Sequence, residues 1–312
     1  MCPAVARRRD RDDASQEISR LSQDVVELKN RNDRARISLR GAEIRQWSVA
    51  GRELMWQPDA RFWDAVSPIL FPLVGWSNGG QIRVDGTTYP MGVHGFAASL
   101  GFQLVEHDEA SALLRLAENA ETLTRYPFRF ELFIRYRLHE GFLEAAFCVR
   151  NTDTRSLPFA IGIHPGFRWP LSAASRAGHR IEFDEAEEPF VPEISPRGLF
   201  RPTSRTVPLD GRDLPLTEEL LASEALCFLD VRSRGLRFRA PDGCAIRIET
   251  EGFPHLALWT RPGAPFLSIE SWTGHGDPEG FAGDITEKPS IRLLPAGGED
   301  TCRVRYSLEN AA

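Results

Sequence analysis

The segment from Phe128 to Val149 constrains the fold more than any other part of the chain. Apolar residues take every second position from Phe128 to Leu138, and the alternation resumes at Leu143 after a His-Glu-Gly connection. A period of two is typical of β-strands with one buried face, and two strands joined by so short a turn run antiparallel. The chain is therefore expected to be built on antiparallel β-sheet.

Similar alternation recurs at 245–250 and 304–308, whereas no helical pattern of comparable length follows the first 25 residues. Few helices leave few βαβ units, which argues against a parallel sheet. Since no Gly-, Ser- or Pro-rich linker divides the chain, we predict one all-β domain over 26–312, a large antiparallel sandwich whose last strand closes a sheet. The Pro- and charge-rich stretch 177–216 is expected to be a surface excursion or a lid.

Residues 1–25 form a charged leader. Its arginines are followed by no apolar stretch, and Ile18, Leu21, Val25 and Leu28 lie on a helix-like stripe, so the leader is expected to be helical or disordered. Nowhere does the chain reach the roughly 18 consecutive apolar residues of a membrane span. We therefore expect no membrane association.

Charge and cysteine content exclude further classes of protein. The 44 acidic residues outnumber the 38 basic ones, giving a formal charge of -6, so nucleic acid is not an expected partner. The five cysteines are odd in number and far apart, without a Cys-x-x-Cys pair. They are interpreted as reduced, mostly buried thiols of a cytoplasmic protein. As for assembly, a monomer or a homodimer is expected.

Three side chains stand where acid and base chemistry is plausible. His94 lies between Gly92 and Gly95, and His164 ends an apolar run that breaks at Pro165-Gly166. Glu270 ends another apolar run, on the same strand face as Phe266 and Ser268 if the segment is extended. Histidine and glutamate are common proton-transfer groups. Taken singly, each also fits a structural role, as a turn histidine or an edge-strand glutamate.

Aromatic and polar residues near these segments suggest a sugar site, because sugar C-H faces stack on rings while hydroxyls bond polar side chains. The aromatic candidates are Trp76, Phe96, Phe167, Trp169, Trp259 and Trp272. The polar candidates are Asn78, Arg168, Asp230, His255 and Asp277. Each is also explicable as a core, turn or surface residue. No zinc-type spacing, Gly-x-Ser-x-Gly elbow or phosphate loop occurs, so no metal or cofactor is predicted.

Several segments together resemble the aldose 1-epimerase (galactose mutarotase) superfamily, and most of all its bacterial LacX-like branch. They occur in the order of the family over nearly the whole region after the leader. The segments are GAEIRQWSVAGRELMWQ (41–57), PILFPLVG (68–75), YPMGVHGFA (89–97), YPFRFEL (126–132), LPFAIGIHPGFRWP (157–170), GFPHLALW (252–259) and PFLSIESWTGHGDPEGFAGDITEKPSIRLLPAGG (265–298).

The resemblance implies a supersandwich of antiparallel sheets that interconverts the α and β anomers of an aldose without a cofactor. It places the catalytic base on Glu270, the acid on His164 and a second substrate-contacting histidine on His94. Candidate substrate contacts are Trp76, Asn78, Phe96, Arg168, Asp230 and Trp272. Asp230 is the nearest candidate for the substrate-binding aspartate of the family, which has no secure match.

Two positions depart from the family. Many relatives have arginine where this chain has Trp76 and Ala98. Arginine is the natural bidentate partner of a phosphate, so its absence favours a neutral hexose over a sugar phosphate. The alternatives are a hexose-6-phosphate 1-epimerase and a sugar-binding or regulatory module without catalysis. A glycoside hydrolase is disfavoured because no second carboxylate has a context like that of Glu270.

Overall fold

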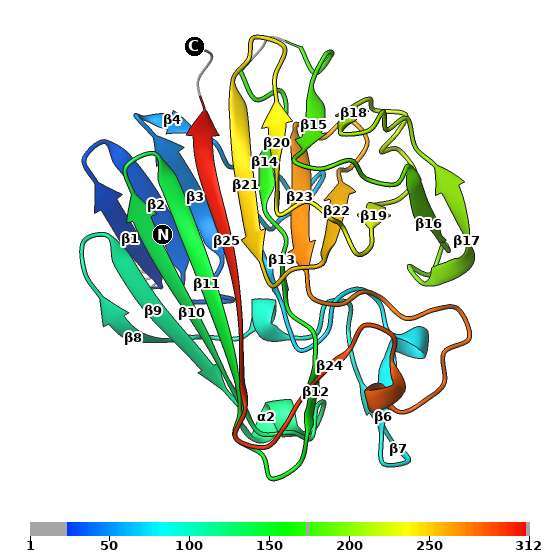
Figure 1. Cartoon of the computed structure of the whole chain (residues 1–312). Coiled ribbons are helices and arrows are strands. Elements are labelled where there is room, and N and C mark those ends of the chain that lie inside the picture. Colours follow the sequence, from blue (N-terminus) through cyan, green and yellow to red (C-terminus); the bar gives the residue numbers. More distant parts are fainter. Residues whose placement is uncertain (1–23, 173–174, 310–312) are drawn as a thin grey trace, which may run out of the picture.

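The computed structural model describes residues 24–172 and 175–309, which form one domain made almost entirely of antiparallel strands (Figure 1). Helical structure in these residues is confined to single turns. These are α2 (Ala120–Leu123) and the 3-10 turns η1 (Asn78–Gly80), η2 (Ala97–Ser99) and η3 (Ile285–Glu287). The predicted all-β, single-domain fold is confirmed.

The largest sheet has nine strands in the order β18-β15-β20-β21-β25-β11-β10-β9-β8. Their bounds are β8 (Gln103–His107), β9 (Ser111–Ala117), β10 (Phe130–His139), β11 (Phe142–Asn151), β15 (Arg180–Phe183), β18 (Asp213–Pro215), β20 (Gly235–Arg239), β21 (Ala245–Glu251) and β25 (Glu299–Glu309). The hairpin β10-β11 pairs antiparallel over its full length, as its alternation and short turn predict. The last strand lies inside the sheet, between β21 and β11.

A four-stranded sheet and three two-stranded pairs accompany it. The four-stranded sheet consists of β1 (Val25–Asn30), β2 (Asp33–Ser38), β3 (Ile44–Val49) and β4 (Arg52–Glu53). The pairs are β6 (Gln81–Val84) with β7 (Thr87–Pro90), β12 (Leu157–Phe159) with β24 (Arg292–Leu294), and β16 (Phe190–Ile194) with β17 (Phe200–Thr206). The four-stranded sheet packs against β10, where the Tyr136 hydroxyl donates to the Ala42 carbonyl.

A six-stranded sheet carries the residues of greatest interest. Its central path is β19-β22-β23-β13-β5, and β14 pairs with β23 beyond the end of β13. The bounds are β5 (Ile69–Leu70), β13 (Gly162–Ile163), β14 (Gly166–Arg168), β19 (Leu226–Phe228), β22 (His255–Trp259) and β23 (Phe266–Trp272). Every residue of β23 is buried, because strands flank both its edges and core clusters cover both its faces.

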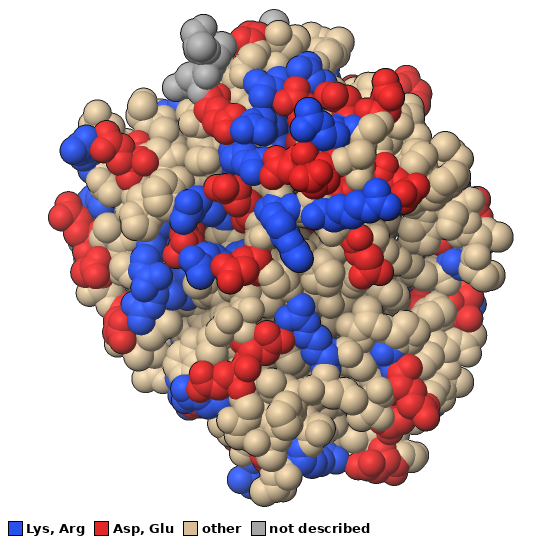
Figure 2. Space-filling view, in the orientation of Figure 1, with Lys and Arg blue, Asp and Glu red and all other residues tan. Residues whose placement is uncertain are grey.

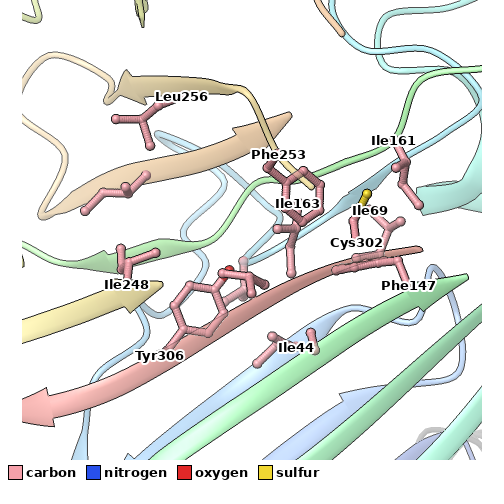
Figure 3. Packing of buried hydrophobic residues seen from close by; sticks show 14 of the residues in the cluster. Ile44, Ile69, Phe147, Ile161, Ile163, Ile248, Phe253, Leu256, Cys302 and Tyr306 are labelled. Carbon is pink, nitrogen blue, oxygen red and sulfur yellow. The ribbon is translucent and has the colours of Figure 1, made fainter. Parts of the chain in front are cut away.

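One face of the six-stranded sheet forms the main core with the nine-stranded sheet. Ile163 and Leu256 from the smaller sheet lie opposite Phe147, Ile248 and Tyr306 from the larger one (Figure 3). Successive residues of a strand point to opposite faces. The neighbouring residues Leu70, Ala257 and Trp272 therefore form a second, smaller cluster on the other face. That second face is free to hold a site.

The outer face of the nine-stranded sheet is covered by alternating acidic and basic side chains (Figure 2). Cross-strand pairs such as Arg150 with Glu299 and Arg247 with Asp184 neutralise one another. Such a face is a solvated surface with little net field.

The structure corrects three expectations. Stretch 177–216 is not an excursion: it holds β15 to β18, and Ile181, Phe183 and Leu214 are buried in the sheet. Val25 and Leu28 belong to strand β1 rather than to a helix, because Leu28 packs into the core; the rest of the predicted leader lies outside the described residues. The last strand is central and does not close an edge.

Candidate active site

Glu270 lies at the centre of the second face of the six-stranded sheet. Its side chain is only 2% exposed, and Ala257 and then Cys227 lie beside it on β22 and β19. The Trp272 indole N–H donates to Oε2 of Glu270 at 3.1 Å. Burial raises the pKa of the Glu270 carboxyl well above its usual range. The edge-strand interpretation of this glutamate is therefore wrong.

His164 stands at the break between β13 and β14, where the chain stops pairing with β23 and resumes at Gly166. Its Nε2 lies 3.3 Å from Oε1 of Glu270, and its Nδ1 lies 2.7 Å from Oγ of Ser268. The ring is buried, and burial lowers the pKa of His164 well below its usual range. A buried carboxyl and a buried imidazole thus face each other within reach of one shared proton.

His94 completes the trio, with its ring centroid 5.7 Å from that of His164. Its backbone has φ of 62°, a left-handed conformation, and the next residue, Gly95, has φ of 74° at a place where a Cβ would collide with the Phe71 carbonyl. The Gly75 amide donates to Nδ1 of His94 at 3.1 Å, so the neutral ring carries its proton on Nε2. Burial lowers the pKa of His94 to about 4. His94 is therefore a neutral N–H donor near neutral pH.

Aromatic rings surround His164 on two sides. The Trp63 ring centroid lies 4.9 Å from that of His164, and Trp259 packs edge-on at 5.4 Å. Phe266 contacts both indoles. Trp63 could not be predicted from the sequence, because it lies in the loop between β4 and β5, which has no periodic pattern. Its proximity to His164 is a tertiary contact.

The predicted substrate contacts are dispersed. Trp272 reaches the trio, but as the hydrogen-bond donor to Glu270. Phe96 is a core residue, 2% exposed and packed against Phe71, Tyr126 and Phe130, so the structure does not place it at the site. Arg168 is exposed on β14, and its Nε donates to the Met55 carbonyl at 3.3 Å.

The remaining candidates, Asn78, Trp76 and Asp230, are partly or fully exposed. Asn78 uses its amide to bind the Phe281 carbonyl, and Trp76 is 47% exposed and packs against Gly198. Asp230 is exposed, and its backbone amide donates to Nδ1 of His255 at 3.1 Å. These three remain predictions as sugar contacts.

A second histidine pair adjoins the trio. His255 pairs with Trp272 across β22 and β23, so its side chain shares the face of Glu270. The His275 ring centroid lies 5.5 Å from His255 and 4.8 Å from Phe200. Gly276, which follows His275 in the chain, packs against Gly75, whose backbone amide donates to His94. The face around Glu270 is thus lined by imidazoles on both sides.

Comparison with known proteins identifies the family of the chain. The sequence model of the family described as aldose 1-epimerase matches residues 24–265. The chain belongs to the aldose 1-epimerase family. The matched range includes His94 and His164 and ends before Glu270.

Relatives within this family extend the match over most of the chain. Protein LacX of Lactococcus lactis subsp. lactis is 29% identical, over 91% of this chain and 98% of its own length. A galactose mutarotase-like protein from Lactobacillus casei has a TM-score of 0.86 at 29% identity, covering 91% of this chain and all of its own. A galactose mutarotase related enzyme from Lactobacillus acidophilus has a TM-score of 0.85 at 26% identity, covering 92% of this chain and 97% of its own. The galactose mutarotase-like fold expected from the sequence is thereby confirmed.

In this aldose 1-epimerase family member, the described residues can be searched for metal-ligand groups, membrane-spanning helices and disulfides. Within 24–172 and 175–309, no three His, Cys, Asp or Glu side chains are grouped so as to hold a metal ion. In the same residues, no helix has the length and apolar character to cross a membrane. The described cysteines Cys148, Cys227, Cys244 and Cys302 are free thiols.

Proposed function

We propose that this protein is an aldose 1-epimerase that interconverts the α and β anomers of a neutral aldose hexose. The observation that carries the proposal is the 3.3 Å contact between Nε2 of His164 and Oε1 of Glu270 in a buried setting. Ring opening of a hemiacetal needs one group to take the C1 hydroxyl proton and another to protonate the ring oxygen. This pair supplies both groups without a cofactor.

In the proposed reaction, the ionised Glu270 takes the proton from the C1 hydroxyl as protonated His164 gives its proton to the ring oxygen. The C1–O5 bond breaks and an open-chain aldehyde forms, leaving a neutral acid and a neutral imidazole. Rotation about C1–C2 and reclosure with the proton transfers reversed give the other anomer. His94, with its fixed Nε2–H, donates a hydrogen bond to a sugar oxygen.

Burial favours the neutral form of the pair, as the raised pKa of Glu270 and the lowered pKa of His164 both indicate. This is the protonation state that accompanies the open-chain aldehyde in the proposed reaction. The site therefore stabilises the intermediate rather than the closed ring. Substrate binding has to move the shared proton from Glu270 to His164 over the 3.3 Å contact.

The neutral character of the sugar is supported by Trp76 and Ala98, the two positions at which the family resemblance implies arginine. Asn78, Asp230 and the indole of Trp76 remain the proposed hydroxyl and ring contacts. The free thiols of the described cysteines fit the proposed cytoplasmic location. A monomer or homodimer is proposed as the assembly.

Polarimetry of freshly dissolved α-glucose and α-galactose tests the proposal. We expect the wild type to accelerate anomerisation and Glu270→Gln to lower kcat/KM by roughly 10²- to 10⁴-fold, because proton transfer is lost while the shape is kept. Glu249→Gln, the same substitution on the outer face of β21, is the control and should match the wild type. Saturable sugar binding by calorimetry without any rate effect would establish a non-catalytic module instead. Faster turnover of glucose 6-phosphate than of glucose would overturn the neutral substrate.

A further inference from the structure

Ser268 occupies a position in β23 that shares the face of Glu270. Its side chain is fully buried, with Gly166 of β14 on one side and Trp259 of β22 on the other. No solvent reaches its hydroxyl, so the hydrogen bonds that it makes must be internal.

The hydroxyl has two partners, His164 and the carbonyl of Pro165, and both contacts can be hydrogen bonds in only one pair of directions. Oγ lies 3.1 Å from the Pro165 carbonyl and 2.7 Å from Nδ1 of His164. A carbonyl oxygen only accepts, so for both contacts to be hydrogen bonds the single hydroxyl proton must point to the Pro165 carbonyl, which also accepts from the Ile269 amide. The lone pairs of Oγ therefore face His164, whose Nδ1 must carry a proton and donate it.

This assignment determines the other nitrogen of the ring. With Nδ1 protonated, Nε2 of the neutral ring is a lone pair, and it faces Oε1 of Glu270. Oε2 is already occupied by the Trp272 indole N–H. The exchangeable proton is thus confined to the line between Oε1 and Nε2. His94 has the opposite tautomer, since its Nδ1 accepts from the Gly75 amide.

We infer that Ser268 is a positioning residue that holds His164 in its Nδ1–H tautomer, so that Nε2 alone exchanges a proton with Glu270 and the sugar. The inference rests on the proposed epimerase function for its catalytic meaning. The physical reason is proton counting. Without the Ser268 oxygen, His164 can carry its proton on Nε2 facing an ionised Glu270, a state with one proton fewer than the working pair.

The matched control lies on the same strand. Ser271 is also buried, but its Oγ has no hydrogen-bond partner and points to the opposite face. Ser268→Ala and Ser271→Ala therefore remove the same atom from the same strand, and only the first removes an acceptor for His164. Ser268→Thr keeps the hydroxyl and suits a strand, so it serves as the rescuing variant.

The experiment combines tautomer detection with a pH profile. In ¹⁵N-histidine-labelled protein, with the His164 signals assigned through His164→Gln, we expect a protonated Nδ1 in the wild type, Ser271→Ala and Ser268→Thr. In Ser268→Ala, we expect a shift to the Nε2–H tautomer. In the epimerase assay, Ser268→Ala should lower kcat by roughly 10- to 100-fold, the usual effect of losing an orienting partner. Its alkaline limb should move to lower pH, with KM little changed.

The two proposals fail in different ways. If the wild type accelerates no sugar, the epimerase proposal fails, while the tautomer comparison still decides the role of Ser268. If the wild type is active and Ser268→Ala keeps both the wild-type tautomer and the wild-type pH profile, the inference about Ser268 is overturned. The same holds if Ser271→Ala shows the changes expected of Ser268→Ala, because the effect then comes from general packing.

Discussion

At the scale of single residues, the site is governed by what burial does to two titratable groups. Glu270 and His164 are both nearly inaccessible to water, which raises the pKa of the Glu270 carboxyl and lowers that of the His164 imidazole. Both groups are therefore held in their uncharged forms in the folded protein. The buried pair therefore lowers the free energy of unfolding at neutral pH, because the Glu270 carboxyl must take up a proton when the chain folds.

Glu270→Gln is accordingly expected to stabilise the protein, more so as the pH rises. An unfolded chain ionises this carboxyl near its usual pKa of 4.5, whereas the folded chain does not. Between the usual pKa and the raised folded pKa, the wild type therefore loses up to about 1.4 kcal/mol of stability per pH unit relative to the variant. Urea unfolding of both proteins from pH 5 to pH 8 measures the difference. A constant offset at every pH would show that Glu270 is not held protonated.

Sequence reasoning reached the trio because each member lies in a local context that is itself unusual. His94 sits between glycines, His164 at the break of a strand, and Glu270 within an apolar run. It failed for Phe96, whose closeness to His94 in sequence says nothing about direction once the backbone turns left-handed at residues 94 and 95. No local sequence pattern marks Ser268, since its role depends on contacts with Pro165 and His164 across the sheet.

At the scale of elements, the short strand β13 sets the position of β23, the strand that carries Glu270. Gly162 lies opposite Trp272, and a Cβ at Gly162 would lie 2.8 Å from Cδ1 of the indole. The absence of a side chain there lets the indole approach closely enough to hold the carboxylate of Glu270.

Gly162→Ala is expected to displace the Trp272 ring and with it the carboxylate. Overpacking of this kind costs about 1–3 kcal/mol of stability. Displacement of a reacting group by a fraction of an ångström should lower kcat roughly 10- to 100-fold. Stopped-flow anomerisation and thermal unfolding measure the two effects. Gly101→Ala is the control, because nothing lies within 4 Å of its added carbon; if both variants behave alike, the contact with Trp272 is irrelevant.

Local pattern also explains which elements could be predicted. The hairpin β10-β11 was predictable because apolar and polar residues alternate along both strands on either side of one short turn. Strands β15 and β18 were not, because each has three or four residues within a stretch rich in proline and charge. The order of strands in the nine-stranded sheet depends on pairings between distant segments, and no local pattern records these.

At the scale of the whole molecule, a buried ion pair ties together segments from across the chain. Lys288 and Asp277 are both about 4% exposed and hydrogen-bonded to each other. The second carboxylate oxygen of Asp277 accepts from the backbone amide of Asn78, and the backbone carbonyl of Asp277 accepts from the backbone amide of Phe200. The pair therefore anchors the loop that carries His275 and Gly276 beside the site.

Lys288→Met is expected to destabilise the fold by about 3–5 kcal/mol, because it leaves the Asp277 charge buried without its partner. The double variant Lys288→Met, Asp277→Leu should recover a large part of that loss. Chemical unfolding of the single and double variants measures both. Arg232→Met, which removes a pair with Glu188 at the surface, should leave stability unchanged. A single variant as stable as the wild type would mean that the ion pair does not hold the loop.

The place of β25 has a consequence for how the protein is made on the ribosome. Because residues 299–309 lie between β21 and β11, no strand joins the two halves of the largest sheet by hydrogen bonds until these residues emerge from the exit tunnel. Until then both flanking strands present unpaired edges, which are templates for aggregation. Translation that halts before residue 299 should therefore yield an insoluble product, and a nascent chain should depend on chaperones until residues 299–309 have emerged.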